Sequence, residues 1–265
     1  MKNKAPIGTG FFKDHSYEIA RQSYPEEVTT FLKKTFGHES DLNVCEVGAG
    51  SGLFTSNLHN ALSSKINKLV IVDPDPDSIK QHKQNFSFVK EYPIDYLNST
   101  SDNIIATDKF DLIVCSHSFH WFNQDATRIA FSNILKDNGQ VLIFARFHIP
   151  EEDEATAEWI RMTRFGKRLD GVKNNLEMYS ESLIDAFYGH HVERIVLCKK
   201  IIPFSLEILQ QNIKTRINAS SYPEKEKKDL WHQKQIELNN YFKIFQKKGF
   251  VSINETSFCY LSYLN

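Results

Sequence analysis

A glycine-rich turn follows the first hydrophobic strand that the sequence predicts. The segment Glu46-Val47-Gly48-Ala49-Gly50-Ser51-Gly52 closes an apolar stretch at 42–47 and precedes a helical pattern that begins at Leu53. Glycine lets a backbone turn tightly and approach a ligand closely. In an open parallel sheet, ligands bind beyond the carboxyl ends of the strands. We therefore expect a ligand-binding loop here rather than a plain strand-to-helix turn.

Asp73 lies where the second predicted strand, 68–72, ends, a position from which a carboxylate can bond to the hydroxyls of a ribose. The dinucleotide fingerprint requires glycine or alanine where this chain has Leu53. The spacing therefore favours a nucleoside cofactor without a pyrophosphate. Two other classes stay open: a nicotinamide-dependent oxidoreductase and a non-catalytic nucleoside-binding protein. The intact glycines and Asp73 argue against a binding protein that has lost its chemistry.

Predicted strands and helices alternate up to about Phe147. We expect strands at 42–47, 68–72, 86–89, 110–115 and 141–144, and helices at 53–62, 77–85 and 125–136. This alternation predicts a parallel sheet that is covered by helices on both faces. The fold class is α/β.

After about Phe147 the alternation stops. Two further strands are expected at 191–200 and 256–263, and helices at 204–217 and 222–247. The pattern indicates a helical lid inserted into one seven-stranded, mostly parallel, doubly wound sheet. We thus expect an N-terminal helical segment at 1–40 and an α/β domain at 41–265, with lid insertions at about 150–190 and 203–247.

The composition excludes several classes of function. The chain has 32 Lys plus Arg and 33 Asp plus Glu, a net charge of −1, which argues against a nucleic-acid partner. It contains no apolar run of about 18 residues that could cross a membrane, and no secretory apolar segment near its start. With 41% hydrophobic and 25% charged residues, we expect a cytoplasmic globular protein with no membrane partner. The oligomeric state is not predicted.

The cysteines, Cys45, Cys115, Cys198 and Cys259, lie far apart in the sequence. None of the short spacings that bind zinc or form redox pairs occurs. Each cysteine falls in a predicted strand, so we expect buried free thiols and no metal site.

The segment from Glu46 to Gly52, Asp73 and the strand Phe110-Asp111-Leu112-Ile113 together resemble class I S-adenosylmethionine-dependent methyltransferases. The resemblance covers residues 15–147 well and the remainder loosely. It implies the cofactor S-adenosyl-L-methionine, with the methionine part on the glycine loop, the ribose on Asp73 and the adenine beside residues after the third strand. The cofactor-binding residues that it implies are Tyr17, Arg21, Glu46, Gly48, Ala49, Gly50, Gly52, Asp73, Pro74, Ile94, Asp95 and Ser116.

The triplet His120-Trp121-Phe122, just past the fourth strand, resembles the trans-aconitate methyltransferase-like branch, also called methyltransferase type 11. The branch's N-terminal and lid patterns are matched by Tyr17, Arg21, Tyr24, Pro25, Arg216, Ser220, Ser221 and Tyr222. The branch contains carboxylate O-methyltransferases and members with other substrates. A small-molecule substrate is implied, and we expect it to contact Tyr24, His120, Trp121, Arg146, Arg216, Ser220 and Tyr222.

Each of these side chains also has a purely structural interpretation. Trp121 could pack over the carboxyl ends of the strands, Tyr24 could pack where a helix begins, and Arg216 could be a solvated charge. His117 is assigned a structural role. Ser221 could cap the helix that follows it. Arg146, at the end of the fifth strand, could hold an acidic substrate with two hydrogen bonds or form a salt bridge to acids of the lid.

Methyl transfer from a sulfonium is an in-line displacement that depends on alignment and on exclusion of water. A carboxylate acceptor is already ionised near neutral pH and needs no general base. A phenol or amine needs one, and His120 is the catalytic candidate for that role. The favoured acceptor is a carboxylate oxygen, and the alternative is N- or O-methylation of an amine or phenol.

Overall fold

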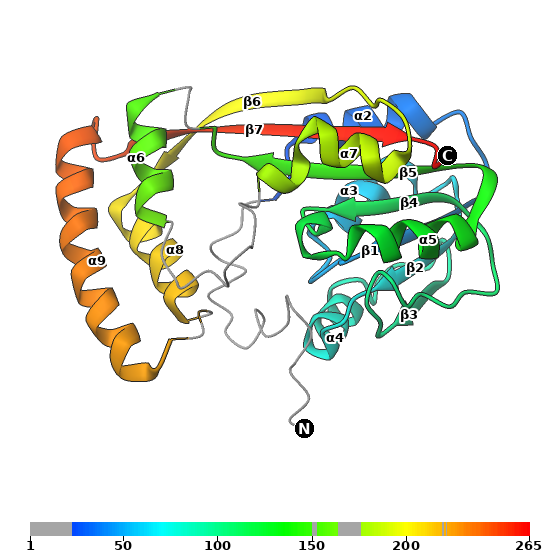
Figure 1. Ribbon diagram of the computed structural model, residues 1–265, viewed down its shortest axis with the longest axis horizontal. Helices are drawn as coiled ribbons and strands as arrows, with labels where there is room; N and C mark the ends of the chain where they lie inside the picture. The colour runs from blue at the N-terminus through cyan, green and yellow to red at the C-terminus, as the bar shows by residue number, and fades with distance from the viewer. Residues whose placement is uncertain (1–22, 150–152, 164–175, 219, 221) are drawn as a thin grey trace.

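A seven-stranded sheet with the order β3-β2-β1-β4-β5-β7-β6 forms the centre of the protein (Figure 1). The computed structural model describes residues 23–149, 153–163, 176–218, 220 and 222–265. The first five strands are parallel, whereas β7 runs antiparallel to both β5 and β6. The strands are β1 Leu42–Val47, β2 Ile66–Val72, β3 Ile94–Leu97, β4 Phe110–Ser116, β5 Leu135–Phe147, β6 Ile195–Phe204 and β7 Val251–Ser262.

Helices cover both faces of the sheet because its central strands are apolar on both sides. Successive residues such as Val44 and Cys45 on β1 enter different hydrophobic clusters, one on each face. Helices α5 and α7 pack on one face, and α2 and α3 on the other. The bounds of the helices around the sheet are α2 Glu26–Phe36, α3 Leu53–Leu62, α4 Pro76–Asn85, α5 Gln124–Ile134 and α7 Glu181–Tyr188.

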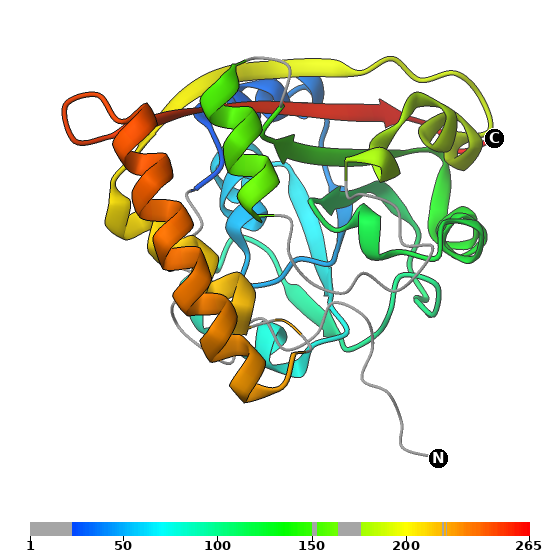
Figure 2. The ribbon, with the colours of Figure 1, turned by 60° about the vertical axis from the view of Figure 1, so that its left-hand side comes forward.

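Three further helices form a layer at one end of the sheet: α6 Glu154–Thr163, α8 Leu206–Asn218 and α9 Glu224–Phe245. They pack around a third hydrophobic cluster that includes Trp159, Leu209 and Leu238 together with residues of β6 and β7. The long strands β6 and β7 run along the top of Figure 1 and connect this layer to the sheet, and Figure 2 shows α8 and α9 from the side. Within the described ranges, no helix is both long and apolar enough to span a membrane.

The α/β class and the seven-stranded, mostly parallel sheet agree with the sequence prediction. The third strand was expected at 86–89, but β3 is Ile94–Leu97. Phe86 and Val89 are buried in the core instead, so their apolar signal reflects packing of the segment after α4. Helix α7, which lies within the range expected for the lid, packs on the sheet through Ile184, Phe187 and Tyr188.

Tyr188 shows how α7 is fixed to the sheet. Its ring is fully buried, and its hydroxyl contacts the carbonyl oxygens of Val141 on β5 at 2.9 Å and Tyr260 on β7 at 3.2 Å. A buried carbonyl that loses its donor carries the full cost of desolvation. The hydroxyl therefore stabilises the antiparallel pair of β5 and β7, and β7 continues into the layer of α6, α8 and α9.

We predict that Tyr188→Phe lowers the free energy of unfolding by about 1–2 kcal/mol, because it removes a buried donor and keeps the ring. Urea unfolding measures this change. The matched control is Tyr263→Phe, since the side chain of Tyr263 is 50% exposed, and we expect it to change stability little. Equal effects of the two substitutions would contradict the role given to Tyr188.

Candidate functional site

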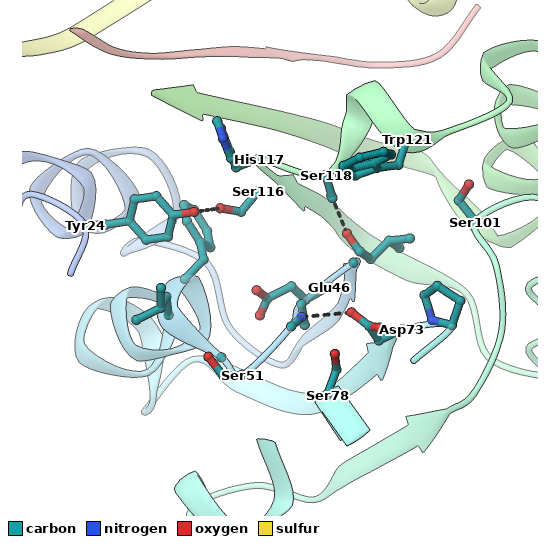
Figure 3. A pocket seen from close by; sticks show the side chains of 18 of the residues that line it. Tyr24, Glu46, Ser51, Asp73, Ser78, Ser101, Ser116, His117, Ser118 and Trp121 are labelled. Atoms are coloured by element: carbon teal, nitrogen blue, oxygen red, sulfur yellow. Dashed lines mark hydrogen bonds between the residues drawn. The ribbon is translucent and has the colours of Figure 1, made fainter. Parts of the chain in front are cut away.

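A cavity of about 1100 Å³ lies at the carboxyl ends of β1, β2 and β4 (Figure 3). Its wall contains the whole glycine loop, the end of β2, residues after β3 and β4, and one side of α8. The predicted residues that line it are Tyr24, Glu46, Gly48, Ala49, Gly50, Gly52, Asp73, Pro74, Ser116, His120, Trp121 and Arg216. The structure thus brings most of the expected site together at one edge of the sheet.

The backbone of the glycine loop takes a form that few other residues could adopt. Gly48, Gly50 and Gly52 all have positive φ angles, of 72°, 59° and 95°. A Cβ atom on Gly48 would lie 2.5 Å from Cβ of Ser118, and one on Gly52 would lie 2.3 Å from the ring of Phe86. The glycines are therefore required both for the turn and for the close packing behind it.

Glu46, one residue before the end of β1, is a fully buried acid. One of its oxygens, Oε2, accepts a hydrogen bond of 2.6 Å from Thr55, whereas the other, Oε1, has no partner among the described residues. Burial, opposed by the Thr55 hydrogen bond and reinforced by the charge of Asp73, raises the pKa of Glu46 to about 8. A buried acceptor with no donor is rare in proteins and indicates a site for a ligand.

A chain of hydrogen bonds orients Glu46 from behind. Thr55 donates to Glu46 and also contacts Nε2 of His82 at 2.9 Å, and Nδ1 of His82 contacts the hydroxyl of Tyr96 at 3.2 Å. Burial lowers the pKa of His82 to about 4, so this ring is neutral near neutral pH. When Glu46 is ionised, Thr55 gives its only proton to that carboxylate, so Nε2 of His82 donates to Thr55 and Nδ1 accepts from Tyr96. The chain fixes which oxygen of Glu46 stays unpaired.

Asp73 lies beside Glu46 at the end of β2, and it is also buried. Its two oxygens each accept one backbone N–H at 2.9 Å, Oδ2 from Gly50 and Oδ1 from Asp75. Burial is the main cause that raises its pKa, and hydrogen bonds oppose the shift. The side chain of Ser78 gives it a further hydrogen bond. A carboxylate has about four lone-pair sites, so Asp73 can still accept from a ligand's hydroxyl group.

The structure corrects the expected adenine contacts. Ile94 and Asp95 lie inside β3, not after it, and they are not among the residues that line the cavity. The carboxylate of Asp95 forms an ion pair with Lys68 at 2.8 Å. The residues that do follow β3 and line the cavity are Ser99, Thr100, Ser101 and Asp102. Because the third strand was predicted too early in the sequence, the predicted adenine contacts also lie too early.

Residues after β4 form the next part of the wall. Ser116 donates a hydrogen bond of 2.9 Å to the hydroxyl of Tyr24, as Figure 3 shows, so Tyr24 both packs in the core and reaches the cavity. His117, which the sequence analysis assigned a structural role, lines the cavity and has a φ of 50°, a left-handed conformation that costs energy outside glycine. His120 and Trp121 follow in a short 3-10 turn, Phe119–Trp121.

The structure also corrects the placing of Arg146. Its guanidinium lies 4.6 Å from the centre of the Tyr24 ring, donates to the carbonyl oxygen of Ser23 at 3.2 Å and lies 3.9 Å from Glu255. It is not among the residues that line the cavity, and these contacts are with other residues of the protein. Among the described residues, the arginine in the cavity wall is Arg216 on α8, an exposed residue.

The remaining lid predictions fall outside the wall. Ser220 donates to the carbonyl oxygen of Ile217 at the end of α8, and neither Ser220 nor Tyr222 lines the cavity. Asn212 and Thr215, one turn and one residue before Arg216, do line it, and no local sequence signal singled them out. Tyr17, Arg21 and Ser221 lie outside the described residues.

The hydrogen-bonding groups of the cavity fit S-adenosylmethionine. The unpaired Oε1 of Glu46 can accept from the amino group of the methionine part, and Asp73 can accept from the ribose hydroxyls. The whole glycine loop lines the same cavity, so its backbone is within reach of this ligand. Two buried acids with raised pKa values also suit a ligand that carries positive charge.

The raised pKa of Glu46 leads to a prediction about stability. An unfolded glutamate ionises near pH 4.5, whereas folded Glu46 holds its proton to about pH 8. Folding therefore binds a proton between these values, so the ligand-free protein loses stability as pH rises through this window. We expect Glu46→Gln to remove that loss, and urea unfolding of both proteins at a series of pH values measures it.

The matched control is Glu91→Gln. Glu91 is exposed, and backbone hydrogen bonding lowers its pKa, so it stays ionised across the window whether folded or unfolded. The stability difference between this control and the wild type should not depend on pH above about pH 5. Parallel pH curves for the wild type and Glu46→Gln would show that Glu46 is not protonated in the fold.

Comparisons with known proteins match the chain to methyltransferases. A methyltransferase domain family matches residues 45–141. An uncharacterised methyltransferase-like protein of Schizosaccharomyces pombe is 25% identical over 220 residues, which cover 81% of this chain and 79% of that protein. An uncharacterised methyltransferase of the same yeast is 28% identical over 138 residues, 52% of each chain.

A solved structure shares the fold. It is a SAM-dependent methyltransferase from Thiobacillus denitrificans in complex with S-adenosyl-L-homocysteine, with a TM-score of 0.51, 12% identity and coverage of 92% of both chains. The matched domain begins at the end of β1 and contains the glycine loop, Asp73 and the residues after β4. From the matched domain, the related sequences and the fold, we conclude that the chain is a class I S-adenosylmethionine-dependent methyltransferase.

Proposed function

We propose that the protein transfers the methyl group of S-adenosylmethionine to a carboxylate oxygen of a small molecule. One observation carries the proposal: a single cavity contains buried acids at the glycine loop and an arginine, Arg216, from α8. The acids suit the cationic cofactor, and a guanidinium suits an anionic acceptor. The resemblance of His120-Trp121-Phe122 to the trans-aconitate methyltransferase-like branch supports the same acceptor.

In this proposal the cofactor lies along the glycine loop. Glu46 accepts from its amino group, Asp73 from its ribose, and the segment Ser99–Asp102 surrounds its adenine. When bound, the cofactor supplies an electrophilic methyl group on a positively charged sulfur. The chain's own residues hold the acceptor oxygen in line with that methyl group, which is the main work that such a displacement needs.

We propose that α6, α8 and α9 act as a lid, together with an N-terminal segment at 1–40, around an α/β domain at 41–265. Asn212, Thr215 and Arg216 on α8 then cover the acceptor end of the cavity. A lid excludes water, which strengthens the interaction of Arg216 with an anion. The free thiols of Cys45, Cys115 and Cys259 suit a reducing compartment, and we place the enzyme in the cytoplasm.

We predict that Asp73→Asn weakens binding of S-adenosylhomocysteine by about tenfold or more, because the charged acceptor of two ribose hydrogen bonds is lost. Isothermal titration calorimetry measures the dissociation constant. Asp77→Asn is the matched control, since Asp77 is an exposed acid at the start of α4. An unchanged constant for Asp73→Asn, on folded protein, would remove Asp73 from the cofactor site.

We predict that Arg216→Gln raises KM for a small carboxylic acid by about tenfold or more and leaves binding of S-adenosylhomocysteine unchanged, because a charge-assisted hydrogen bond to the acceptor is lost. Transfer of a labelled methyl group to a panel of small acids, phenols and amines identifies the acceptor and gives KM. The control is Arg161→Gln on α6, whose exposed guanidinium pairs with Glu158. Methylation of phenols or amines alone would overturn the proposed acceptor class.

A further inference from the structure

We infer that the tautomer of His82 follows the charge of Glu46. When the acid ionises, the hydrogen-bonded chain of Thr55, His82 and Tyr96 carries its proton to the edge of the sheet. The inference goes beyond methyl transfer, and its link to the cofactor rests on the proposed contact of Glu46 with the amino group. Thr55 and His82 are positioning residues, since they act through Glu46 and do not line the cofactor cavity.

The chain leads from the cofactor cavity to the edge strand in three contacts. Oε2 of Glu46 lies 2.6 Å from the Thr55 hydroxyl oxygen, which lies 2.9 Å from Nε2 of His82. Nδ1 of His82 lies 3.2 Å from the hydroxyl oxygen of Tyr96 on β3. The first three side chains are fully buried, whereas Tyr96 is half-buried, lines a second cavity and lies under the ammonium of Lys83. The chain thus connects a buried acid with the outside of the sheet.

His82 is held in one place as a neutral ring. It stacks on Phe86 at 4.6 Å between ring centroids and meets the ring of Tyr96 edge-on at 5.5 Å. Both of its ring nitrogens contact hydroxyl groups rather than acids, and burial lowers its pKa to about 4. A neutral imidazole carries one proton, so one nitrogen donates while the other accepts.

The count of protons sets the direction of the chain when Glu46 is ionised. The carboxylate can only accept, so Thr55 gives it its single proton. The oxygen of Thr55 then accepts from Nε2–H of His82, and Nδ1 accepts from Tyr96.

The same chain runs the other way when Glu46 is protonated. A proton on Oε1 would be a buried donor with no acceptor among the described residues, whereas a proton on Oε2 has the oxygen of Thr55 at 2.6 Å. Thr55 then donates to Nε2 of His82, and Nδ1–H donates to Tyr96. His82 therefore carries its proton on Nδ1 beside a neutral Glu46 and on Nε2 beside an ionised one.

One proton leaves when the chain reverses. The proton of Glu46 passes to Thr55, that of Thr55 to Nε2 of His82, that of Nδ1 to Tyr96, and that of the Tyr96 hydroxyl to water. Each group of the chain ends neutral, and Glu46 ends as a carboxylate. An ammonium group at Oε1 favours this state, because an opposite charge stabilises an ionised acid. Glu46 can therefore ionise while a ligand covers its cavity side.

Other ionisable groups near Glu46 do not take up this proton. Both oxygens of Asp73 already accept backbone N–H groups, which favour its charged form. Cys45, Cys115 and Tyr92 also feel the charge of Glu46, and burial raises the pKa of each, so they stay neutral. The charge of Glu46 is thus the variable to which His82 responds.

The direct test is the tautomer of His82 in the ligand-free protein, read by long-range ¹H–¹⁵N correlation spectra at about pH 6.5 and about pH 9.5. The signals of His82 are assigned as those missing from His82→Gln. Because burial raises the pKa of Glu46 to about 8, we expect Nδ1–H at the lower pH and Nε2–H at the higher. One unchanged tautomer, or protons on both nitrogens at the higher pH, would overturn the inference. In Glu46→Gln the tautomer should not change with pH.

Addition of S-adenosylhomocysteine at the lower pH tests the link to the cofactor. We expect binding to convert the Nδ1–H pattern of His82 into the Nε2–H pattern. Protons on both nitrogens of the complex would show that the proton stays on His82, and would overturn the exit. A tautomer that follows pH but not binding, with binding measured by calorimetry, would support the coupling and overturn the proposed contact of Glu46 with the amino group.

Thr55→Val and Thr55→Ser form a matched pair. Valine keeps the shape of threonine and breaks the chain, whereas serine keeps the hydroxyl. We expect the response of His82 to pH to be lost in Thr55→Val and kept in Thr55→Ser. S-adenosylhomocysteine should bind about tenfold or more weakly to Thr55→Val alone, because a hydrogen bond to the ionised acid is lost. A valine variant in which His82 still follows pH, or equal affinities of the two variants, would overturn the role of the chain.

Discussion

The burial of two carboxylates at the ends of β1 and β2 is the constraint on which the rest of the site depends. Glu46 and Asp73 are withdrawn from water, and burial raises the pKa of each. A fold tolerates such groups only if they are hydrogen-bonded or if a ligand completes them. Asp73 is completed by two backbone N–H groups, whereas Glu46 keeps one oxygen without a donor. A positively charged ligand group would give Oε1 of Glu46 the donor that it lacks.

The surrounding residues hold Glu46 and Asp73 in this arrangement. The glycine loop bends around the acids because no side chain on Gly48 or Gly52 would fit, and the chain from Tyr96 through His82 and Thr55 orients Glu46. Across the cavity, α8 contributes Arg216 from a layer with its own hydrophobic cluster, carried on β6 and β7. In the proposed function, the buried acids hold the cofactor and Arg216 holds an acid acceptor in the same cavity.

Patterns in the sequence predicted the features that depend on residues close together in the chain. The alternation of strands and helices predicted the α/β sheet, and the spacing of Gly48, Gly50 and Gly52 before Leu53 predicted a ligand loop. The third strand was misplaced because Phe86 and Val89 are buried without forming a strand, whereas β3 is short and mostly half-buried at the sheet edge. The contacts of Arg146 could not be predicted because its partner, the ring of Tyr24, is distant in sequence. Contacts such as Thr55 with His82 have no signature along the chain and required the fold.

Calorimetric titration of the wild-type protein with S-adenosylhomocysteine, repeated near neutral pH in two buffers with different heats of ionisation, tests the central claim most directly. NADH is titrated in parallel. Because free Glu46 is mostly protonated below about pH 8 and must ionise to hold an amino group, binding should release protons, and the heat should depend on the buffer. We predict micromolar binding of S-adenosylhomocysteine with proton release and none of NADH. Absence of binding on folded protein, or binding of NADH alone, would contradict the account.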